Sequence, residues 1–135
     1  MNKLIRFGVS MEKYLLDKFD SLIKERKYTN RSEAFRDLIR QELIKKEWEK
    51  GKECAGAIVI IYDHHKRELL NKLISIQHEY QRIIIATTHV HLDHYNCMEI
   101  IAIRGFPAHV SKLSDTLRAL KGVKHGTISL TSTNI

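Results

Sequence analysis

A run of apolar, β-branched residues that ends in two histidines, His89 and His91, limits the fold of this chain more than any other feature. The run predicts a buried strand. Side chains alternate between the two faces of a strand, so the two imidazoles point the same way. A polar tetrapeptide follows and predicts a hairpin loop, which returns a second strand over residues 97–104 antiparallel to the first. In that register Cys97 lies opposite His91.

Two imidazoles and a thiol therefore converge at one end of the predicted hairpin. These donors suit nickel, copper, zinc or cobalt, and they suit magnesium or calcium poorly. A polar, partly exposed strand end with a buried cysteine is the alternative interpretation. The spacing H-x-H-x5-C on one hairpin favours a metal site over that alternative.

Length and composition indicate a globular protein. At 135 residues the chain has room for one ordinary domain or two very small ones. Its apolar runs are too short to cross a bilayer, and its first residues lack the long apolar segment of a signal peptide. Two cysteines, Cys54 and Cys97, make no disulfide framework. We therefore expect a cytoplasmic protein with no membrane partner, in which a cysteine beside histidines is a metal ligand.

Charge and histidine are distributed differently along the chain. The formal net charge of +7 suggests a polyanionic partner, and the basic excess is spread over both halves. All 8 histidines lie after residue 51. This asymmetry predicts two units with different chemistry, of which the second handles metal.

Residues 1–50 predict one strand and two helices. Apolar and polar side chains alternate over residues 4–11, and apolar residues recur at helical spacing over residues 12–27. Asn30 can cap a second helix, with Glu33 three residues later as in a capping box. The strand has no partner in its own unit, so we expect an intertwined dimer with a two-stranded antiparallel ribbon. The second helix is expected to bury Ala34, Phe35, Leu38, Ile39, Leu43 and Trp48.

The remaining residues predict a domain of the α+β class. Strands and helices follow in the order β-α-β-β-α-β, the split βαβ arrangement of ferredoxin-like domains. A short polar linker, residues 50–52, separates this domain, residues 53–135, from the first, residues 1–50. The expected strands cover residues 53–62, 82–91, 97–104 and 127–131, and the expected helices cover residues 65–80 and 107–120.

From end to end, the chain resembles the nickel-responsive transcriptional regulators of the NikR family. The N-terminal unit is similar to the family's ribbon-helix-helix DNA-binding domain through the run Asn30–Asp37, and the C-terminal unit is similar to its ACT-like regulatory domain. A ribbon-helix-helix unit alone says little about the family, whereas its combination with the histidine and cysteine spacing is specific. The matching residues of the C-terminal unit are Gln77-His78, His89-Val90-His91, Asn96-Cys97-Met98-Glu99 and Gly122-Val123-Lys124-His125-Gly126.

The resemblance implies a high-affinity nickel site with one Ni²⁺ per subunit, held by His78, His89, His91 and Cys97. It also implies that His78 comes from a neighbouring subunit. From the residues alone, a solvated histidine at a helix end is the alternative. Three imidazoles and a thiolate form a strong-field set in which nickel(II) can be square planar, whereas zinc prefers a tetrahedron. We expect the other histidines at the surface or in structural roles, with weaker accessory sites as the alternative for some of them.

In ribbon-helix-helix proteins the ribbon of the dimer enters the DNA major groove. The side chains on the outer face of the predicted ribbon belong to Arg6, Gly8 and Ser10. Arg6 can bind guanine through two hydrogen bonds, and Ser10 can contact a base or a phosphate. Gly8 departs from the small hydroxyl residue that is usual in the family and contacts no base directly. An exposed polar strand face is the alternative interpretation.

The start of the second helix carries two further candidate sites. Asn30, Arg31 and Ser32 open a helix whose free N–H groups can bind a phosphate, and plain helix capping is compatible with that role. Glu33 and Asp37 lie four residues apart on one helix face, which is usually a solvated face. In some members of the family that the chain resembles, matching carboxylates bind a second, hard cation when DNA is bound.

Together these features predict a metal-dependent repressor with no catalytic function, assembled as a homotetramer from two dimers. The expected target is double-stranded DNA, the inverted-repeat operator of a nickel-uptake system. Two rival functions stay open. An antitoxin-like regulator whose C-terminal domain binds another ligand or partner predicts that alanine at His89 or Cys97 leaves regulation unchanged. A metal-binding enzyme or carrier predicts metal transfer without DNA and tolerance of Arg6→Ala.

Overall fold

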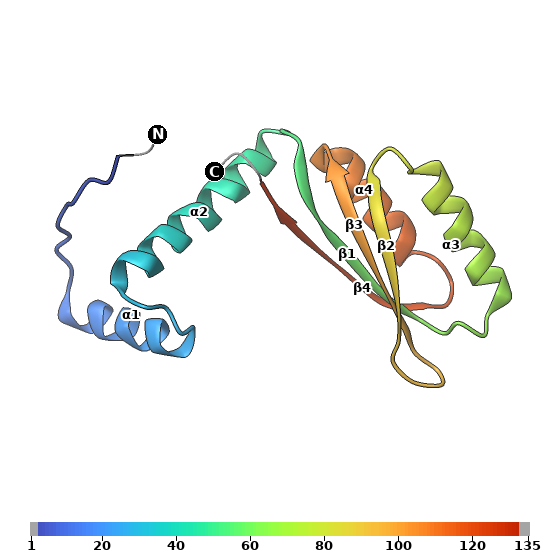
Figure 1. The fold of residues 1–135 in the computed structure, drawn as a ribbon, viewed down its shortest axis with the longest axis horizontal. Coiled ribbons are helices and arrows are strands. Elements are labelled where there is room, and N and C mark those ends of the chain that lie inside the picture. The colour runs from blue at the N-terminus through green and yellow to red at the C-terminus, as the bar shows by residue number, and fades with distance from the viewer. Residues whose placement is uncertain (1–2, 133–135) are drawn as a thin grey trace. The chain divides into compact units, whose positions relative to one another are not determined.

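The structure, a computed structural model, describes residues 3–132 of the chain (Figure 1). It divides into two compact units, of which the first ends at Glu42 and the second begins at Leu43. This division falls inside the second helix, so that helix contributes residues to both units. Among the described residues, no helix is both long enough and apolar enough to cross a membrane.

The N-terminal unit consists of two helices preceded by a segment without regular structure (Figure 1). Helix α1 covers Lys13–Glu25 and helix α2 covers Arg31–Glu49. The helices pack on each other through Phe19 and Phe35, whose ring centroids lie 4.9 Å apart. Ala34 of α2 is also buried.

The strand predicted over residues 4–11 is absent from the single chain, because residues 3–12 form neither helix nor strand. A strand needs hydrogen-bond partners for its backbone, and the described part of this unit holds no second strand. The apolar side chains of the segment are correspondingly open, with Ile5 79% and Phe7 75% exposed. The predicted burial along α2 is confirmed for Ala34, whereas it is wrong for the single chain at Leu38, Ile39, Leu43 and Trp48, which are exposed.

A turn between the helices gives α2 its starting point. Lys27 takes a positive φ of 58°, which reverses the chain after α1. Asn30 then caps α2 as predicted, because its Oδ1 accepts the backbone N–H of Glu33 at 2.9 Å. The Glu33 carboxylate pairs with Arg36 and does not complete a capping box.

The C-terminal unit is a four-stranded antiparallel sheet with two helices. Its strand order is β2-β3-β1-β4, and α3 and α4 connect β1 to β2 and β3 to β4, as the predicted ferredoxin-like arrangement requires (Figure 1). The bounds are β1 Cys54–Tyr62, α3 Arg67–Glu79, β2 Ile84–His91, β3 Cys97–Gly105, α4 Pro107–Arg118 and β4 Val123–Thr131.

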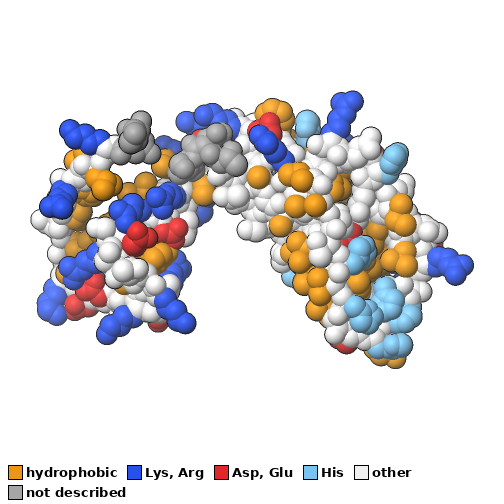
Figure 2. All heavy atoms as spheres, in the orientation of Figure 1, with side chains coloured by type: hydrophobic (Ala, Val, Ile, Leu, Met, Phe, Trp, Pro, Cys, Tyr) orange, Lys and Arg blue, Asp and Glu red, His pale blue; other side chains and the backbone are white. Residues whose placement is uncertain are grey.

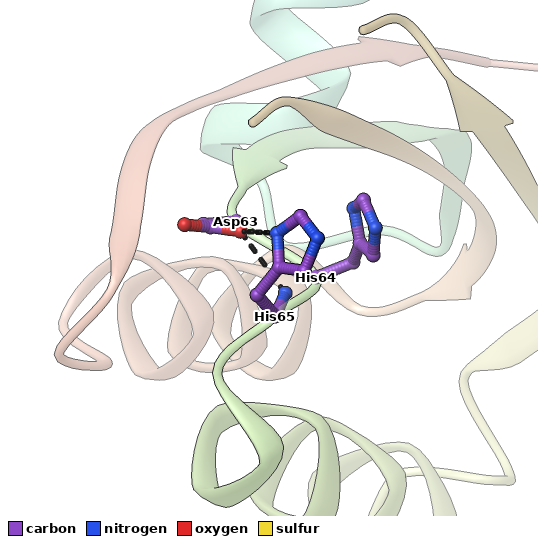
Figure 3. Close-up of side chains that lie close together, drawn as sticks. All are labelled: Asp63, His64 and His65. Atoms are coloured by element: carbon purple, nitrogen blue, oxygen red, sulfur yellow. Dashed lines mark hydrogen bonds and ion pairs between the residues drawn. The ribbon is translucent and has the colours of Figure 1, made fainter. Parts of the chain in front are cut away.

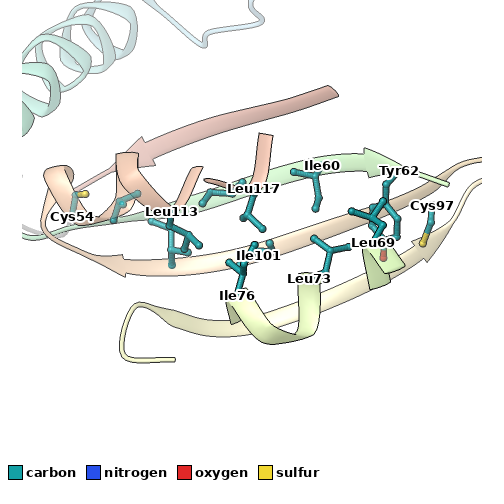
Figure 4. Packing of buried hydrophobic residues seen from close by; sticks show 13 residues of the cluster. Cys54, Ile60, Tyr62, Leu69, Leu73, Ile76, Cys97, Ile101, Leu113 and Leu117 are labelled. Atoms are coloured by element: carbon teal, nitrogen blue, oxygen red, sulfur yellow. The ribbon is translucent and has the colours of Figure 1, made fainter. Parts of the chain in front are cut away.

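One face of this sheet forms the core of the unit. Ile58, Ile60 and Ile101 have no exposed surface and pack with the buried leucines of α3 and α4 (Figure 4). The alternate residues of the same strands, such as Val59 and Ile100, point to the other face and are only half-buried. Hydrophobic side chains gather over the sheet in Figure 2. The single chain therefore leaves an apolar sheet face uncovered.

Candidate metal centre

The β2–β3 hairpin brings three of the four predicted nickel ligands to one face of the sheet. His91 lies opposite Cys97, as the sequence predicts, and His89 lies opposite Glu99. Glu99 is fully buried on the face that the helices cover. Cross-strand partners share a face and side chains repeat every two residues, so all three candidate ligands lie on that face.

The three donors lie near one another at the open end of the hairpin. Cys97 is 6% exposed, and its Sγ lies 4.0 Å from Nδ1 of His89. Both imidazoles are exposed, so they can be reached from solvent. Among the described residues, the three donor atoms do not all come within 4.8 Å of one another. A metal ion therefore has to draw these side chains together.

His78 lies near the end of α3 and its side chain is exposed. Within residues 3–132 it joins no close group of donors with the hairpin ligands. The chain thus supplies three neighbouring donors and presents the fourth at its surface.

A buried hydrogen-bond network lies behind His89. Glu99 has no exposed surface and accepts a bond from Gln77 and one of 3.2 Å from the hydroxyl of Tyr62. The same hydroxyl lies 3.1 Å from Nδ1 of His89, and Nε2 of His89 lies 3.8 Å from Oε1 of Glu99. Nδ1 of His89 is therefore within hydrogen-bond distance of Tyr62, whereas Nε2 is too far from Glu99 for a hydrogen bond. The contact with Tyr62 can orient the ring.

Burial raises the pKa of Tyr62, and the neighbouring Glu99 raises it further. The phenol therefore keeps its proton and stays a hydrogen-bond donor. Sequence reasoning missed both Tyr62 and Glu99 as site residues. A glutamate among the apolar residues of a predicted core strand was the available signal, because a carboxyl is rarely buried without partners.

The loop that joins the two strands is fixed by hydrogen bonds of its own. Asp93 accepts bonds from the Asn96 amide at 3.0 Å and from the backbone N–H of Tyr95 at 2.9 Å. These bonds, that of Asn96 first, lower the pKa of Asp93. Lys124, at the start of β4, donates to Asn96 Oδ1 at 2.6 Å and to the carbonyl oxygen of Tyr95 at 3.1 Å. Lys124 of β4 thus holds the loop at Asn96, the residue directly before Cys97.

The predicted DNA-contacting residues lie in the N-terminal unit. Arg6, Gly8 and Ser10 are exposed in the segment before α1, and a Cβ at Gly8 would meet no heavy atom within 4 Å beyond the glycine and its two chain neighbours. Arg31 is not free in the single chain. Its guanidinium donates two bonds of 2.9 Å to the carboxylate of Asp20, and this pairing lowers the pKa of Asp20.

The remaining N-terminal candidates surround the first turn of α2. Asn30 acts as the helix cap, and Ser32, two residues further on, is exposed. The two carboxylates of the possible second cation site each have a partner. Glu33 pairs with Arg36, and Asp37 accepts bonds from the hydroxyl of Tyr28 and the amide of Gln41.

The fold and the hairpin donors define a two-unit protein in which a helical N-terminal unit is joined to a metal-binding α+β domain. The comparisons with known families agree with both parts. Residues 55–131 match the NikR C terminal nickel binding domain, and residues 5–46 match the ribbon-helix-helix proteins of the copG family.

Relatives of similar length are assigned as nickel-responsive regulators. One from Syntrophus aciditrophicus is 59% identical over 96% of this chain and 95% of its own length. One from Chlorobium limicola is 56% identical over 98% of both chains. The chain belongs to the NikR family of nickel-responsive regulators, which are regulatory proteins and not enzymes.

A solved structure shares the fold at much lower identity. An uncharacterized protein from Thermotoga maritima superposes with a TM-score of 0.54 at 10% sequence identity, covering 58% of this chain and 98% of that one. At this identity the likeness concerns the fold alone.

Proposed function

We propose that this nickel-responsive regulator binds an inverted-repeat DNA operator and represses nickel-uptake genes when nickel is bound. The main support is the placement of His89, His91 and Cys97 on one face of a hairpin, in a chain whose N-terminal unit exposes a segment with the pattern of a DNA-reading ribbon. The protein then acts in the cytoplasm, where it senses the nickel that the uptake system delivers.

The proposed nickel site contains His89, His91 and Cys97 of one chain and a histidine equivalent to His78 of a neighbouring chain, with one nickel ion per subunit. The donor chemistry fits nickel, because imidazole and thiolate are ligands that late first-row metals prefer. The exposed position of His78 supports the shared site, since the side chain is available to another copy. Copper(II) binds such donors more tightly, so selectivity rests on geometry and availability.

The proposed DNA-binding form is a dimer of N-terminal units. A cavity of about 660 Å³ lies between the first segment and the helices of this unit, and Phe7 and Phe35 are among the residues that line it. The same segment of a second chain can fill this cavity and pair with the first as an antiparallel ribbon. Such a ribbon presents Arg6, Gly8 and Ser10 to the bases.

The first turn of α2 is proposed to contact phosphates beside the ribbon. Asn30, Arg31 and Ser32 lie where free helix N–H groups and a guanidinium can meet a phosphate. Arg31 exchanges its bonds with Asp20 for such a contact. Glu33 and Asp37 remain the proposed ligands of a second, hard cation, which requires release of their present partners.

The proposed assembly is a homotetramer made from two dimers. Its support is the uncovered apolar face of the C-terminal sheet, which a second copy can cover. We place the functional division of the chain at the linker, with residues 1–50 for DNA binding and residues 53–135 for nickel binding and tetramer formation.

The test is binding to labelled DNA from upstream of the host's nickel-transport genes, followed by fluorescence anisotropy with nickel and then with a chelator. We expect tight binding that depends on nickel and is lost in Cys97→Ala. The loss should exceed the roughly 10–100-fold cost of losing a residue that only supports a metal ligand. Cys54→Ala is the matched control, because the Cys54 thiol is also buried but donates to the Gly105 carbonyl at the other end of β3.

Equal binding with and without nickel contradicts nickel as the signal and leaves a DNA-binding protein with another ligand. Nickel binding without any DNA binding supports a metal carrier instead. Unchanged nickel dependence in Cys97→Ala contradicts the proposed ligand set.

A further inference from the structure

A two-bond ion pair joins the helices of the N-terminal unit. Nε and Nη2 of Arg31, the first residue of α2, each donate a hydrogen bond of 2.9 Å to the carboxylate of Asp20 on α1. Both side chains lie at the surface, with Arg31 57% and Asp20 42% exposed. We propose that Asp20 sets the affinity of this regulator for DNA by competing with phosphate for Arg31. This inference rests on the proposed contact between Arg31 and DNA.

Carboxylate and phosphate compete because they bind a guanidinium in the same way. The planar fork of arginine matches two oxygens of either anion. In the single chain, Asp20 occupies the edge of Arg31 that Nε and Nη2 form. A phosphate that binds this edge displaces the carboxylate, and one that binds the remaining N–H groups meets the negative charge of Asp20 close by. Asp20 therefore weakens phosphate binding in either arrangement.

The position of Arg31 at the start of a helix favours an anionic partner. The first turn of a helix carries a partial positive charge, which disfavours a cation there and attracts an anion. Asp20 supplies the anion within the single chain, and a phosphate supplies it in the proposed DNA complex. The hydrogen bonds from Arg31 lower the pKa of Asp20, so its carboxylate is charged at neutral pH and remains a competitor.

Other aspartates pair within their own segment of the chain. Oδ1 of Asp63 lies 2.8 Å from Nδ1 of His65, two residues later (Figure 3). The carboxylate of Asp17 lies 2.9 Å from the ammonium group of Lys13, four residues earlier on α1. Neither pair involves a residue that we assign to DNA binding. Asp20 instead reaches a second helix, where its partner is the one basic residue among the proposed phosphate contacts of α2.

The expected effect of the ion pair extends to DNA of any sequence. Because a phosphate contact carries no sequence information, Asp20 lowers the affinity for operator and unrelated DNA by the same factor. Asp20 and Arg31 belong to the N-terminal unit, whereas the candidate nickel ligands belong to the C-terminal unit. The ion pair should therefore leave unchanged the factor by which nickel strengthens DNA binding.

The test uses the full chain with nickel, titrated by anisotropy against the labelled upstream DNA and an unrelated duplex of equal length. Asp17→Asn is the matched control, because it removes the same charge from the same helix and breaks the pair with Lys13. Relative to that control, Asp20→Asn should bind both duplexes about 1.4- to 5-fold more tightly, the usual strength of an exposed ion pair. Asp20→Ser, which also lacks the charge, takes its place if Asp20→Asn fails to fold.

The substitution Arg31→Ala shows whether the gain in affinity passes through the guanidinium. In the Arg31→Ala background, Asp20→Asn and Asp17→Asn should bind DNA equally, because no guanidinium is left to release. The factor by which nickel strengthens binding, measured with nickel and then with a chelator, should be the same in Asp20→Asn as in the original protein.

Two outcomes overturn the role of Asp20 while DNA binding itself stands. The first is binding by Asp20→Asn that equals that of Asp17→Asn or is weaker, since weaker binding means that Asp20 positions Arg31 for the phosphate. The second is a gain that persists in the Arg31→Ala background, which indicates a general effect of charge. Absence of DNA binding by the original protein in the presence of nickel overturns the proposed function and this inference together.

Discussion

At the scale of single residues, the hydrogen bonds of Glu99 explain how its carboxyl can lie in the core beside the candidate metal site. A buried carboxyl is costly unless hydrogen bonds satisfy it, and here Tyr62 and Gln77 both donate to it. The Tyr62 hydroxyl also contacts His89, so the core and the candidate ligand share one network. We infer that this network holds the ring of His89 in place before a metal arrives.

The change Tyr62→Phe tests this network. It removes the hydroxyl that donates to Glu99 and contacts His89, and it keeps the ring that fills the core. We expect about 1 kcal/mol of lost stability, because one hydrogen bond to a buried group is lost. We also expect a roughly 10-fold weaker affinity for nickel, as for other residues that support a metal ligand. Urea unfolding and a nickel titration measure the two effects.

The matched control for Tyr62→Phe is Tyr14→Phe, since the ring of Tyr14 is 63% exposed on α1. The control should change neither quantity. Weaker stability with unchanged nickel affinity would show that the network supports the fold alone.

The residues of the hairpin site could be placed from the sequence, whereas the residues behind it could not. The alternation of a strand and the length of one loop were enough to put His91 opposite Cys97. Tyr62 reaches the site from β1, a strand that is distant in sequence. Such contacts depend on how strands order in the sheet, which a local pattern does not specify.

At the scale of elements, an irregularity in β2 decides which residues share a face. The pairing of β2 with β3 shifts register between Ile84 and Ala86. Ile84 lies opposite the buried Ile103, and His89, an odd number of positions further on, lies opposite the buried Glu99. Strict alternation would send these two side chains to opposite faces, so the bulge puts both on the core side. The sequence pattern gave no sign of this bulge.

The role of Lys124 in holding the loop between β2 and β3 can be tested by substitution. Lys124→Met keeps a long side chain and removes both bonds to the loop residues Tyr95 and Asn96. Because Cys97 follows the loop directly, we expect a weaker affinity for nickel, by about 10-fold, with the metal's absorption spectrum unchanged. A nickel titration followed by absorption spectroscopy checks both parts.

Lys121→Met serves as the control for Lys124→Met. Lys121 is an exposed lysine that precedes the same strand, and within the described part of the chain it makes no hydrogen bond to the loop. An equal loss of affinity in the two variants would indicate a general effect of charge and would contradict the role of Lys124 as a clamp.

At the scale of the whole molecule, the single chain leaves many apolar side chains exposed to solvent. Ile5 and Phe7 are exposed, α2 leaves Ile39 exposed, and one face of the C-terminal sheet is only half-covered. The sequence predicted the helices of the N-terminal unit from local spacing. It predicted a strand there only together with a second copy, because a strand takes its hydrogen bonds from another strand. We propose that a second copy accounts for both, because it would pair with the segment and cover the exposed apolar residues.

The change Phe7→Asp tests whether a second chain covers the N-terminal segment. A charge in the centre of an apolar interface should disrupt the dimer, and loss of an aromatic anchor worth about 2 kcal/mol or more weakens association by at least about 30-fold. We expect DNA binding to fall with it, because a ribbon needs two strands. Nickel binding should persist, since the hairpin ligands lie in the other unit. Phe106→Asp is the control, because Phe106 is 50% exposed and precedes α4, where aspartate caps a helix well. Sedimentation, DNA anisotropy and a nickel titration on both variants decide the matter, and full DNA binding by Phe7→Asp would contradict the ribbon.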